Sequence, residues 1–334
     1  MMCIAASAQV KPKGKPAAQP APQRSNIIIE HTDFTDISQT EVPGAIVFTG
    51  NVRIVHNGVR MSCNKAYHFQ AENYVKAFGN VQMNQGDTIF MNSRYAEYNG
   101  DRQFAYATGG VNMRSPDMTL TTDTIYFDRS IQQAYYNSGG TIVNRENTLV
   151  SKAGRYKLAE RKYEFRTAVT LTNPKYLLKS NHLDYYTNSG HAYVFGPSTI
   201  TSKKDYIYTE KGFYDTKKNL ARLYTNSYIQ YETRTIRGDE MFYDRNKDYS
   251  SATRNVSVVD TVNKYKATGH YAEVFRAKDS LIMTKHALVA TLVEKDSLFT
   301  HAKKMVITGK PGSRIVRGYP NARFYKIDMS GKCD

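Results

Sequence analysis

The chain has 334 residues, enough for two ordinary domains or one long repeat array, and 23 % charged with 40 % hydrophobic residues is a folded composition that excludes general disorder. Tyr is abundant with 26 copies, Thr and Val recur throughout, and long Ala/Leu/Glu/Lys stretches are missing, which favours strands over helices. The net charge of +16 predicts attraction to anionic lipid, phosphorylated glycolipid or nucleic acid, but the spread of the basic residues disfavours a nucleic-acid arm.

The N-terminus is interpreted as the remnant of a signal peptide over residues 1–8. Ala6-Ser7-Ala8 has the small-x-small pattern of a cleavage site, although the basic and most of the apolar regions of such a peptide are missing. A chance Ala-rich start of a cytosolic protein is the alternative. Residues 9–26 are rich in Pro, Lys, Ala and Gln, which predicts a flexible linker.

Residues 27–334 are predicted to be all-β. Short runs of alternating apolar and polar residues are interrupted every eight to twelve positions by Gly, Asn, Asp, Pro or Ser, and no window has a sustained helical period. No run of 18 apolar residues occurs, so no membrane-spanning helix is expected.

An internal repeat of 28 to 30 residues extends through this region and is clearest over residues 40–260. Each unit has a small-residue pair followed by a β-former, as in Gly50-Asn51-Val52, Gly79-Asn80-Val81 and Gly109-Gly110-Val111. The third residues of the units lie at positions 52, 81, 111, 141, 169, 199, 228 and 256. A period kept over seven steps indicates stacked units that share one continuous core.

Two further columns accompany these pairs. An aromatic residue stands 13 or 14 positions before most of them, at Tyr67, Tyr98, Phe127, Tyr156, Tyr185, Tyr214 and Tyr243. An apolar residue stands nine positions after several of them, at Met61, Phe90, Leu120, Val150, Leu178 and Tyr208. If each unit adds one strand spacing, the rise is roughly 4.8 Å per unit, and about ten units predict a rod or gutter on the order of 50 Å long.

Catalytic and metal-binding patterns are missing from the sequence. The eight His residues form no HxH, HxxxH or HExxH spacing, and no GxSxG, P-loop or dinucleotide-binding motif occurs. Cys63 and Cys333 are too far apart to suggest a disulfide framework. We therefore expect no cofactor, no metal and no enzymatic activity, while carboxylates on parallel strands, as in pectate-lyase-like β-helices, stay open as an alternative.

The repeat resembles the OstA-like family, which includes the periplasmic lipopolysaccharide-transport protein LptA and the N-terminal domain of its outer-membrane partner. The resemblance is carried by a rhythm over roughly residues 40–260, as in Ala77-Phe78-Gly79-Asn80-Val81 and Arg237-Gly238-Asp239, with a third copy at Met118–Ile142. The chain is longer than the short LptA type and resembles the extended, Bacteroidota-type members.

The resemblance implies a stacked β-jellyroll, or β-solenoid, that holds the acyl chains of lipopolysaccharide (lipid A) inside and transports it to the outer membrane. It also implies localisation in the periplasm, either free or associated with the outer membrane, and partners among the lipopolysaccharide-transport proteins of the inner and outer membranes. Head-to-tail self-association through exposed edge strands is a further expectation from the family.

Strand alternation selects the inner face of this stack. It places ten apolar residues on one side and polar neighbours such as Arg53 and Gln82 on the other. Met suits an acyl-lined cavity because it repacks around irregular chains. The candidate lipid-binding residues are Ile46, Phe48, Val52, Ile54, Val81, Met83, Val111, Met113, Val169 and Leu171.

Two interpretations of this inner face stay open. The same residues form a dry core if side chains from facing strands fill the interior, and the protein is then a structural or adhesive envelope solenoid without a lipid ligand. An open apolar groove would favour lipid transport instead.

Overall fold

The structure, a computed structural model, describes residues 25–38, 40–310 and 312–333, and most of them lie in strands. The 27 strands form one antiparallel sheet, and one short 3-10 turn, η1, covers Arg276–Lys278. No helix of this part of the chain is long and apolar enough to cross a membrane.

The strands in chain order are β1 Ile28–His31, β2 Phe34–Asp36, β3 Ile46–His56, β4 Val59–Phe69, β5 Tyr74–Gln85, β6 Ile89–Asn99, β7 Phe104–Arg114, β8 Thr119–Asp128, β9 Gln133–Tyr136, β10 Gly140–Asn144, β11 Asn147–Ser151, β12 Ala153–Lys157, β13 Lys162–Asn173, β14 Tyr176–Tyr186, β15 His191–Thr201, β16 Asp205–Asp215, β17 Leu220–Thr225, β18 Tyr228–Tyr231, β19 Arg234–Arg237, β20 Glu240–Asp244, β21 Tyr249–Asp260, β22 Tyr265–Phe275, β23 Ser280–Val293, β24 Asp296–Thr308, β25 Ile315–Tyr319, β26 Ala322–Lys326 and β27 Met329–Cys333.

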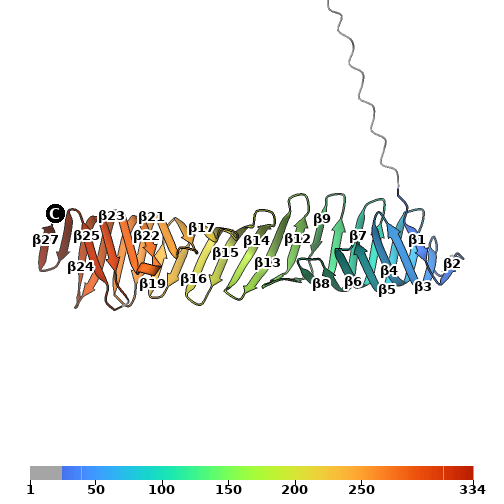
Figure 1. The fold of residues 1–334 in the computed structure, drawn as a ribbon, viewed down its shortest axis with the longest axis horizontal. Helices are drawn as coiled ribbons and strands as arrows, with labels where there is room; N and C mark the ends of the chain where they lie inside the picture. Colours follow the sequence, from blue (N-terminus) through green and yellow to red (C-terminus); the bar gives the residue numbers. More distant parts are fainter. Residues whose placement is uncertain (1–24, 39, 311, 334) are drawn as a thin grey trace, which may run out of the picture.

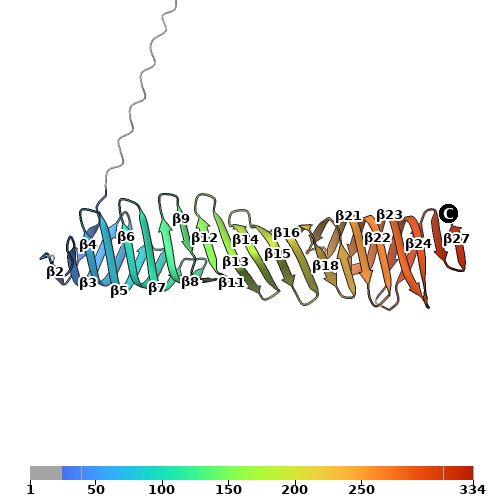
Figure 2. The same ribbon diagram turned by 180° about the vertical axis from the view of Figure 1, so that it is seen from behind.

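The molecule is a long rod whose strands cross its long axis, with β1 and β2 at one end and β27 at the other (Figures 1 and 2). Each long strand pairs with its neighbours in the sequence, so that β3 to β8 form an unbroken meander. This arrangement confirms the predicted all-β stack.

In each repeat, one of the two long strands is bent at its middle by a bulge, as β3 and β5 are. In β3 the pairing register with β4 shifts between Thr49 and Val52, and the two residues between them, Gly50 and Asn51, have φ values of 82° and 45°. The same bulge recurs in β5, β7, β13, β15, β21 and β23. Because a bulge bends a strand and strengthens its twist, the two halves of each strand lie in different walls. The repeated small-residue pair is therefore the bend of the sheet.

The two walls and their rims are named as follows. Wall A holds the strand halves around Ile54, which end at rim A in turns such as residues 57–58. Wall B holds the halves around Ala66, which end at rim B in turns such as residues 70–73. Where the bend interrupts the ladder, one long strand pairs with two short ones, as β13 does with β11 on wall A and β12 on wall B. The walls face each other, since the buried clusters described below draw residues from both.

One expected dimension is wrong. Each repeat of 28 to 30 residues contributes two antiparallel strands to the sheet rather than one, as β3 with β4 and β5 with β6 do. The rise is therefore about 9.6 Å per repeat, twice the expected value, and ten repeats make a rod on the order of 100 Å.

The expected signal-peptide remnant, residues 1–8, lies outside the described residues, and so do residues 9–24 of the expected linker. The first described residues, Ser25 and Asn26, lead directly into β1. Ser25 also contacts both rims, because its carbonyl oxygen lies 2.9 Å from His56 Nε2 and accepts a hydrogen bond from Asn73 Nδ2.

The bend predicts opposite effects for two exchanges of Gly and Ala. Gly79 has a φ of +69° and its added Cβ would lie 2.8 Å from Asn64 Nδ2, so Gly79→Ala should lower the free energy of unfolding by about 1–2 kcal/mol. Ala168 occupies the corresponding bend of β13 with a φ of 51°, so Ala168→Gly should raise it by about 0.5–1 kcal/mol. Urea denaturation of both variants checks this, and a shift of equal sign would contradict the role assigned to the bend.

Candidate functional site

A continuous row of apolar side chains lines the inner face of wall A. Its members are directly paired across neighbouring strands, from β1 to β23, without a polar residue between them. In order along the rod they are Ile29, Ile54, Met61, Met83, Met91, Met113, Leu120, Ile142, Leu149, Leu171, Leu178, Ile200, Ile207, Ile229, Ile236, Val258, Ala267 and Val289.

Small residues on wall B accompany the methionines of this row. Ala66, Ala77, Ala96 and Ala107 form a paired row over β4 to β7 and belong to the same buried cluster as Met61, Met91 and Met113. Alternation of large and small side chains between facing walls lets them fill the interior. Nearer the C-terminal end the methionines lie on wall B instead, at Met241, Met283 and Met305.

The bend itself forms the floor of the interior. Val52, Val81, Val111 and Val169 follow the bulge in their strands and are at most 1 % exposed. The strands between them place hydroxyl groups at the bend, and each hydroxyl donates to the backbone carbonyl two residues later. These pairs are Ser93 with Tyr95, Thr122 with Thr124, Ser151 with Ala153, Ser180 with His182, and Thr209 with Lys211. The buried polar groups of the floor are thus satisfied locally.

All ten predicted inner-face residues face the interior, with Ile46 and Phe48 on wall B and the others on wall A or at the bend. Six of them are buried in the cluster nearest the N-terminus, with Ile46 and Met83 packed against it, while Val169 and Leu171 belong to the next cluster. The polar neighbours Arg53 and Gln82 are exposed. The structure brings the ten residues together as a packed core. The six buried in the first cluster are Phe48, Val52, Ile54, Val81, Val111 and Met113.

Aromatic residues line the inner face of wall B close to rim B. They form one paired row in which Ala often alternates with the ring, and it contains six of the seven residues of the predicted aromatic column: Tyr98, Phe127, Tyr156, Tyr185, Tyr214 and Tyr243. Tyr67 is the exception, because it neighbours the inward Ala66 and His68 occupies its place in the row.

The tyrosines of this row and their neighbours reach toward rim A. The hydroxyl of Tyr98 lies 2.7 Å from His56 Nδ1 on the opposite rim. Tyr163, which pairs with Tyr156, donates a long hydrogen bond of 3.9 Å to Met118 Sδ across the mouth of the interior. Burial raises the pKa of Tyr98, and it raises the pKa of Tyr163 to about 12, so both hydroxyls stay protonated at neutral pH. Each ring is thus apolar toward the floor and a hydrogen-bond donor toward the mouth.

The interior is not uniform along the rod. The first and last clusters hold many fully buried residues, whereas the central one has six buried members, and four of them are 4–8 % exposed. Rim A also changes in character: Val59 and Ile89 lie near its start, amides such as Asn147 and Asn173 near its middle, and the charged Arg234 and Asp260 near its end. The central part is therefore the most loosely covered stretch of the interior.

Much of the inner face was not among the predicted site residues. The wall A row beyond Leu171, from Leu178 to Val289, has the same alternation within each strand, and this pattern is the signal that would have extended the prediction. No group of three or more His, Cys, Asp or Glu is placed to hold a metal ion in the part of the chain that the structure describes.

Comparison with known proteins gives a family match for the N-terminal half. Residues 24–181 match the family model described as OstA-like protein. No curated protein matches the chain. Among solved structures, the chain is similar at 14 % identity to LptH, the LptA homologous periplasmic component of the conserved lipopolysaccharide transport device from Pseudomonas aeruginosa. That match covers 41 % of this chain and 82 % of LptH, with a TM-score of 0.21.

Proposed function

Because the chain is an OstA-like protein over residues 24–181, we propose that it binds the acyl chains of lipopolysaccharide between its two walls and carries the glycolipid across the periplasm to the outer membrane. The observation that carries this proposal is the unbroken apolar row of wall A, which extends from Ile29 to Val289. An uninterrupted apolar track of this kind offers acyl chains a continuous surface between the walls from β1 to β23.

The mechanism follows from the layers of the interior. Acyl chains would separate the walls and replace contacts between them, so that apolar side chains exchange one apolar neighbour for another. Methionines such as Met83 and Met113 adapt to chains of irregular position. The tyrosine row near rim B would then face the boundary between acyl chains and headgroup, where an apolar ring with a polar tip fits. The role is non-enzymatic and needs no cofactor.

Partners at both ends follow from the edges of the sheet. β1 and β2 pair only with β3, while β25 pairs only with β24 and β27 only with β26, so each described end has free strand edges. Ile28 and Phe34 at one end and Ile327 and Met329 at the other are more than half exposed. Such edges add further strands. They would join the protein head to tail with itself and with the transport proteins of the inner and outer membranes.

The central cluster offers the sharpest test. Leu171 is only partly buried and pairs with Leu149 and Leu178 in the wall A row. Leu171→Glu places a charge on this track and should weaken lipid A binding at least tenfold. The matched control is Thr172→Glu, because Thr172 is the next residue of β13, points to the other face and is exposed. Native mass spectrometry with purified lipid A measures both, and thermal melts show whether each variant is folded.

Equal lipid A binding by the two folded variants would contradict the proposal. A second candidate function, a structural or adhesive solenoid without ligand, is favoured by the packing of the end clusters, where Val52, Val81 and Ala267 are fully buried. Native mass spectrometry of the protein purified from its own envelope separates the two functions. A co-purified glycolipid is expected for transport, and its absence from a folded sample supports the structural role.

A further inference from the structure

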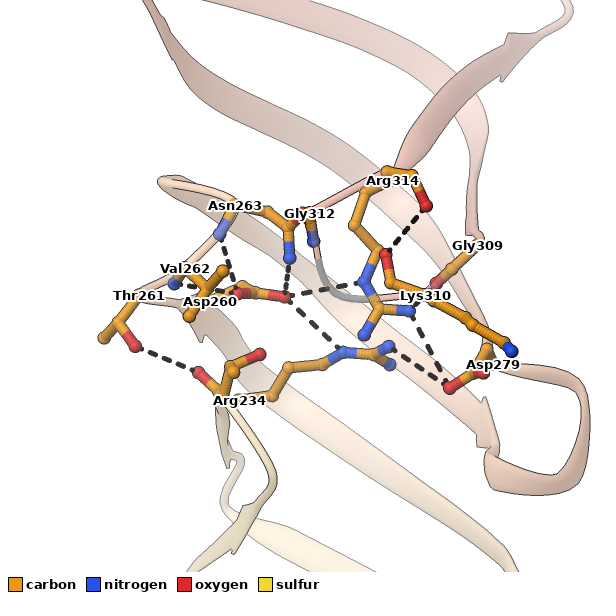
Figure 3. A network of polar contacts seen from close by, with 12 residues as sticks. Arg234, Asp260, Thr261, Val262, Asn263, Asp279, Gly309, Lys310, Gly312 and Arg314 are labelled. Atoms are coloured by element: carbon orange, nitrogen blue, oxygen red, sulfur yellow. Dashed lines mark hydrogen bonds and ion pairs between the residues drawn. The ribbon is translucent and has the colours of Figure 1, made fainter.

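Four charged side chains join the two rims near the C-terminal end. Arg234 and Asp260 come from rim A, and Asp279 and Arg314 come from rim B (Figure 3). Asp260 Oδ2 lies 3.7 Å from Arg234 Nε and 3.6 Å from Arg314 Nε. Asp279 Oδ1 lies 4.0 Å from Arg234 Nη2 and 3.9 Å from Arg314 Nη1. The two guanidinium groups thus lie side by side between the two carboxylates.

Two more contacts close the rims in the same region. The backbone N–H of Gly312 on rim B donates to Asn263 Oδ1 on rim A over 2.9 Å. Arg276 on rim B donates to Asp205 Oδ1 on rim A over 2.7 Å, and its guanidinium lies 4.1 Å from the ring centroid of Tyr231. We call these contacts together the rim clasp. It covers the largest buried cluster, which contains Met283 and Met305 among others.

The central stretch has no counterpart to the clasp. The ion pairs described within residues 104–204 join groups on the same side of the mouth, as Lys162 with Asp184 and Lys157 with Glu164 do. The contact described across the mouth in this stretch is the weak one of Tyr163 with Met118. A ligand whose headgroup projects from the mouth therefore meets an uncovered centre and a closed C-terminal third.

The arginines of the clasp are incompletely satisfied. The side chains of Arg234, Arg276 and Arg314 are 2–5 % exposed. Nε of all three, and Nη2 of Arg276 and Arg314, are buried without a hydrogen-bond partner. The contacts of Arg234 and Arg314 with the carboxylates are 3.6 Å or longer, beyond hydrogen-bond distance. Phosphate oxygens would satisfy such donors, because they accept bidentate hydrogen bonds from guanidinium groups.

We propose that the rim clasp is a gate over the C-terminal third of the interior, opened when phosphate groups of the bound glycolipid take over Arg234, Arg276 and Arg314 from their carboxylate partners. The inference rests on the proposed function and adds the group of the ligand that is recognised and the place where recognition occurs. An acylated molecule without phosphate would occupy the central stretch and leave the clasp closed.

The first test uses the protein alone. The carboxylate of Asp279 is 31 % exposed and contacts both arginines from rim B, so Asp279→Asn weakens the link between the rims and leaves Asp260 in place. Hydrogen-exchange mass spectrometry should show at least tenfold faster exchange of the Gly312 amide. The control is Asp239→Asn, which removes an exposed ion pair with Arg254 and should leave Gly312 unchanged. Unchanged Gly312 exchange in Asp279→Asn would overturn the gate.

The second test adds ligand to the native chain. Lipid A carrying its phosphates should accelerate exchange of the Gly312 amide at least tenfold, whereas dephosphorylated lipid A should not. Acceleration by both lipids, or by neither, overturns recognition of phosphate. Protection of amides over residues 171–178 reports separately whether lipid has bound at all. Absence of that protection counts against the proposed function, and the Asp279→Asn result still decides the gate.

Discussion

Val111→Glu is expected to lower the free energy of unfolding by about 4 kcal/mol or more. Val111 follows the bend of β7, is fully buried and belongs to the cluster that joins both walls. A carboxylate there loses its hydration without a partner, which is among the few single changes with so large an effect. The protein either keeps the new carboxyl group neutral or separates its walls around it.

Its neighbour provides the control. Asn112 is exposed on the outer face of β7, so Asn112→Glu should change the free energy of unfolding by less than about 0.5 kcal/mol. Chemical denaturation of the two variants compares adjacent residues of one strand. Similar losses in both would show that the inner and outer faces are assigned with the wrong parity.

The fold could be predicted because the sequence marks the bend. A strand that must bend at a fixed place needs residues with positive φ, and Gly and Asn adopt it most readily. Gly50-Asn51 and Gly79-Asn80 therefore recur visibly in the sequence. Later bends use Thr167-Ala168 and Arg254-Asn255 in the same conformation, and there the signal fades although the geometry persists.

The paired-strand rise and part of the inner face could not be predicted from the spacing alone. A period of about 29 residues is compatible with one long turn or with two antiparallel strands, and only pairing distinguishes them. The apolar column nine residues after the anchor contains Phe90, yet Met91 is the inward residue, because a turn of three residues, 86–88, shifts the alternation. Val150 and Tyr208 miss the inward Leu149 and Ile207 by one residue in the other direction, because the inward residues at their bends are Gly140 and Ser198, one position before the anchors.

The clasp was missed because its parts are far apart in the sequence. Arg234 and Arg314 are separated by 80 residues, and nothing in the repeat distinguishes either from other turn charges. The turns of rim A and rim B alternate along the chain, so a contact between the rims joins residues that are separated by at least one strand. Such contacts depend on the closure of the walls, which the sequence periodicity does not specify.

Asp260→Ala is expected to lower the free energy of unfolding by about 3–5 kcal/mol, because it leaves Arg234 and Arg314 buried with only the partly exposed Asp279 as a counter-charge. Asp260 also accepts hydrogen bonds from the backbone of Val262 and Asn263. Urea denaturation measures the loss, and Asp239→Ala, at an exposed ion pair, should cost less than about 1 kcal/mol.

Two further measurements separate charge from packing at Asp260. The triple variant Asp260→Ala, Arg234→Met, Arg314→Met should recover most of the loss, since apolar residues replace buried ion pairs at little cost. Burial opposes the effect, but hydrogen bonds from Asn263 and the charge of Arg314 hold the pKa of Asp260 below its ordinary value of 3.8. The stability that Asp260 contributes is therefore complete above pH 3.8 and is lost as the pH falls through its lowered pKa. The deficit of Asp260→Ala should shrink below pH 3.8, and a deficit independent of pH, or a triple variant no more stable than the single one, would show that Asp260 acts through the shape of its turn and not through its charge.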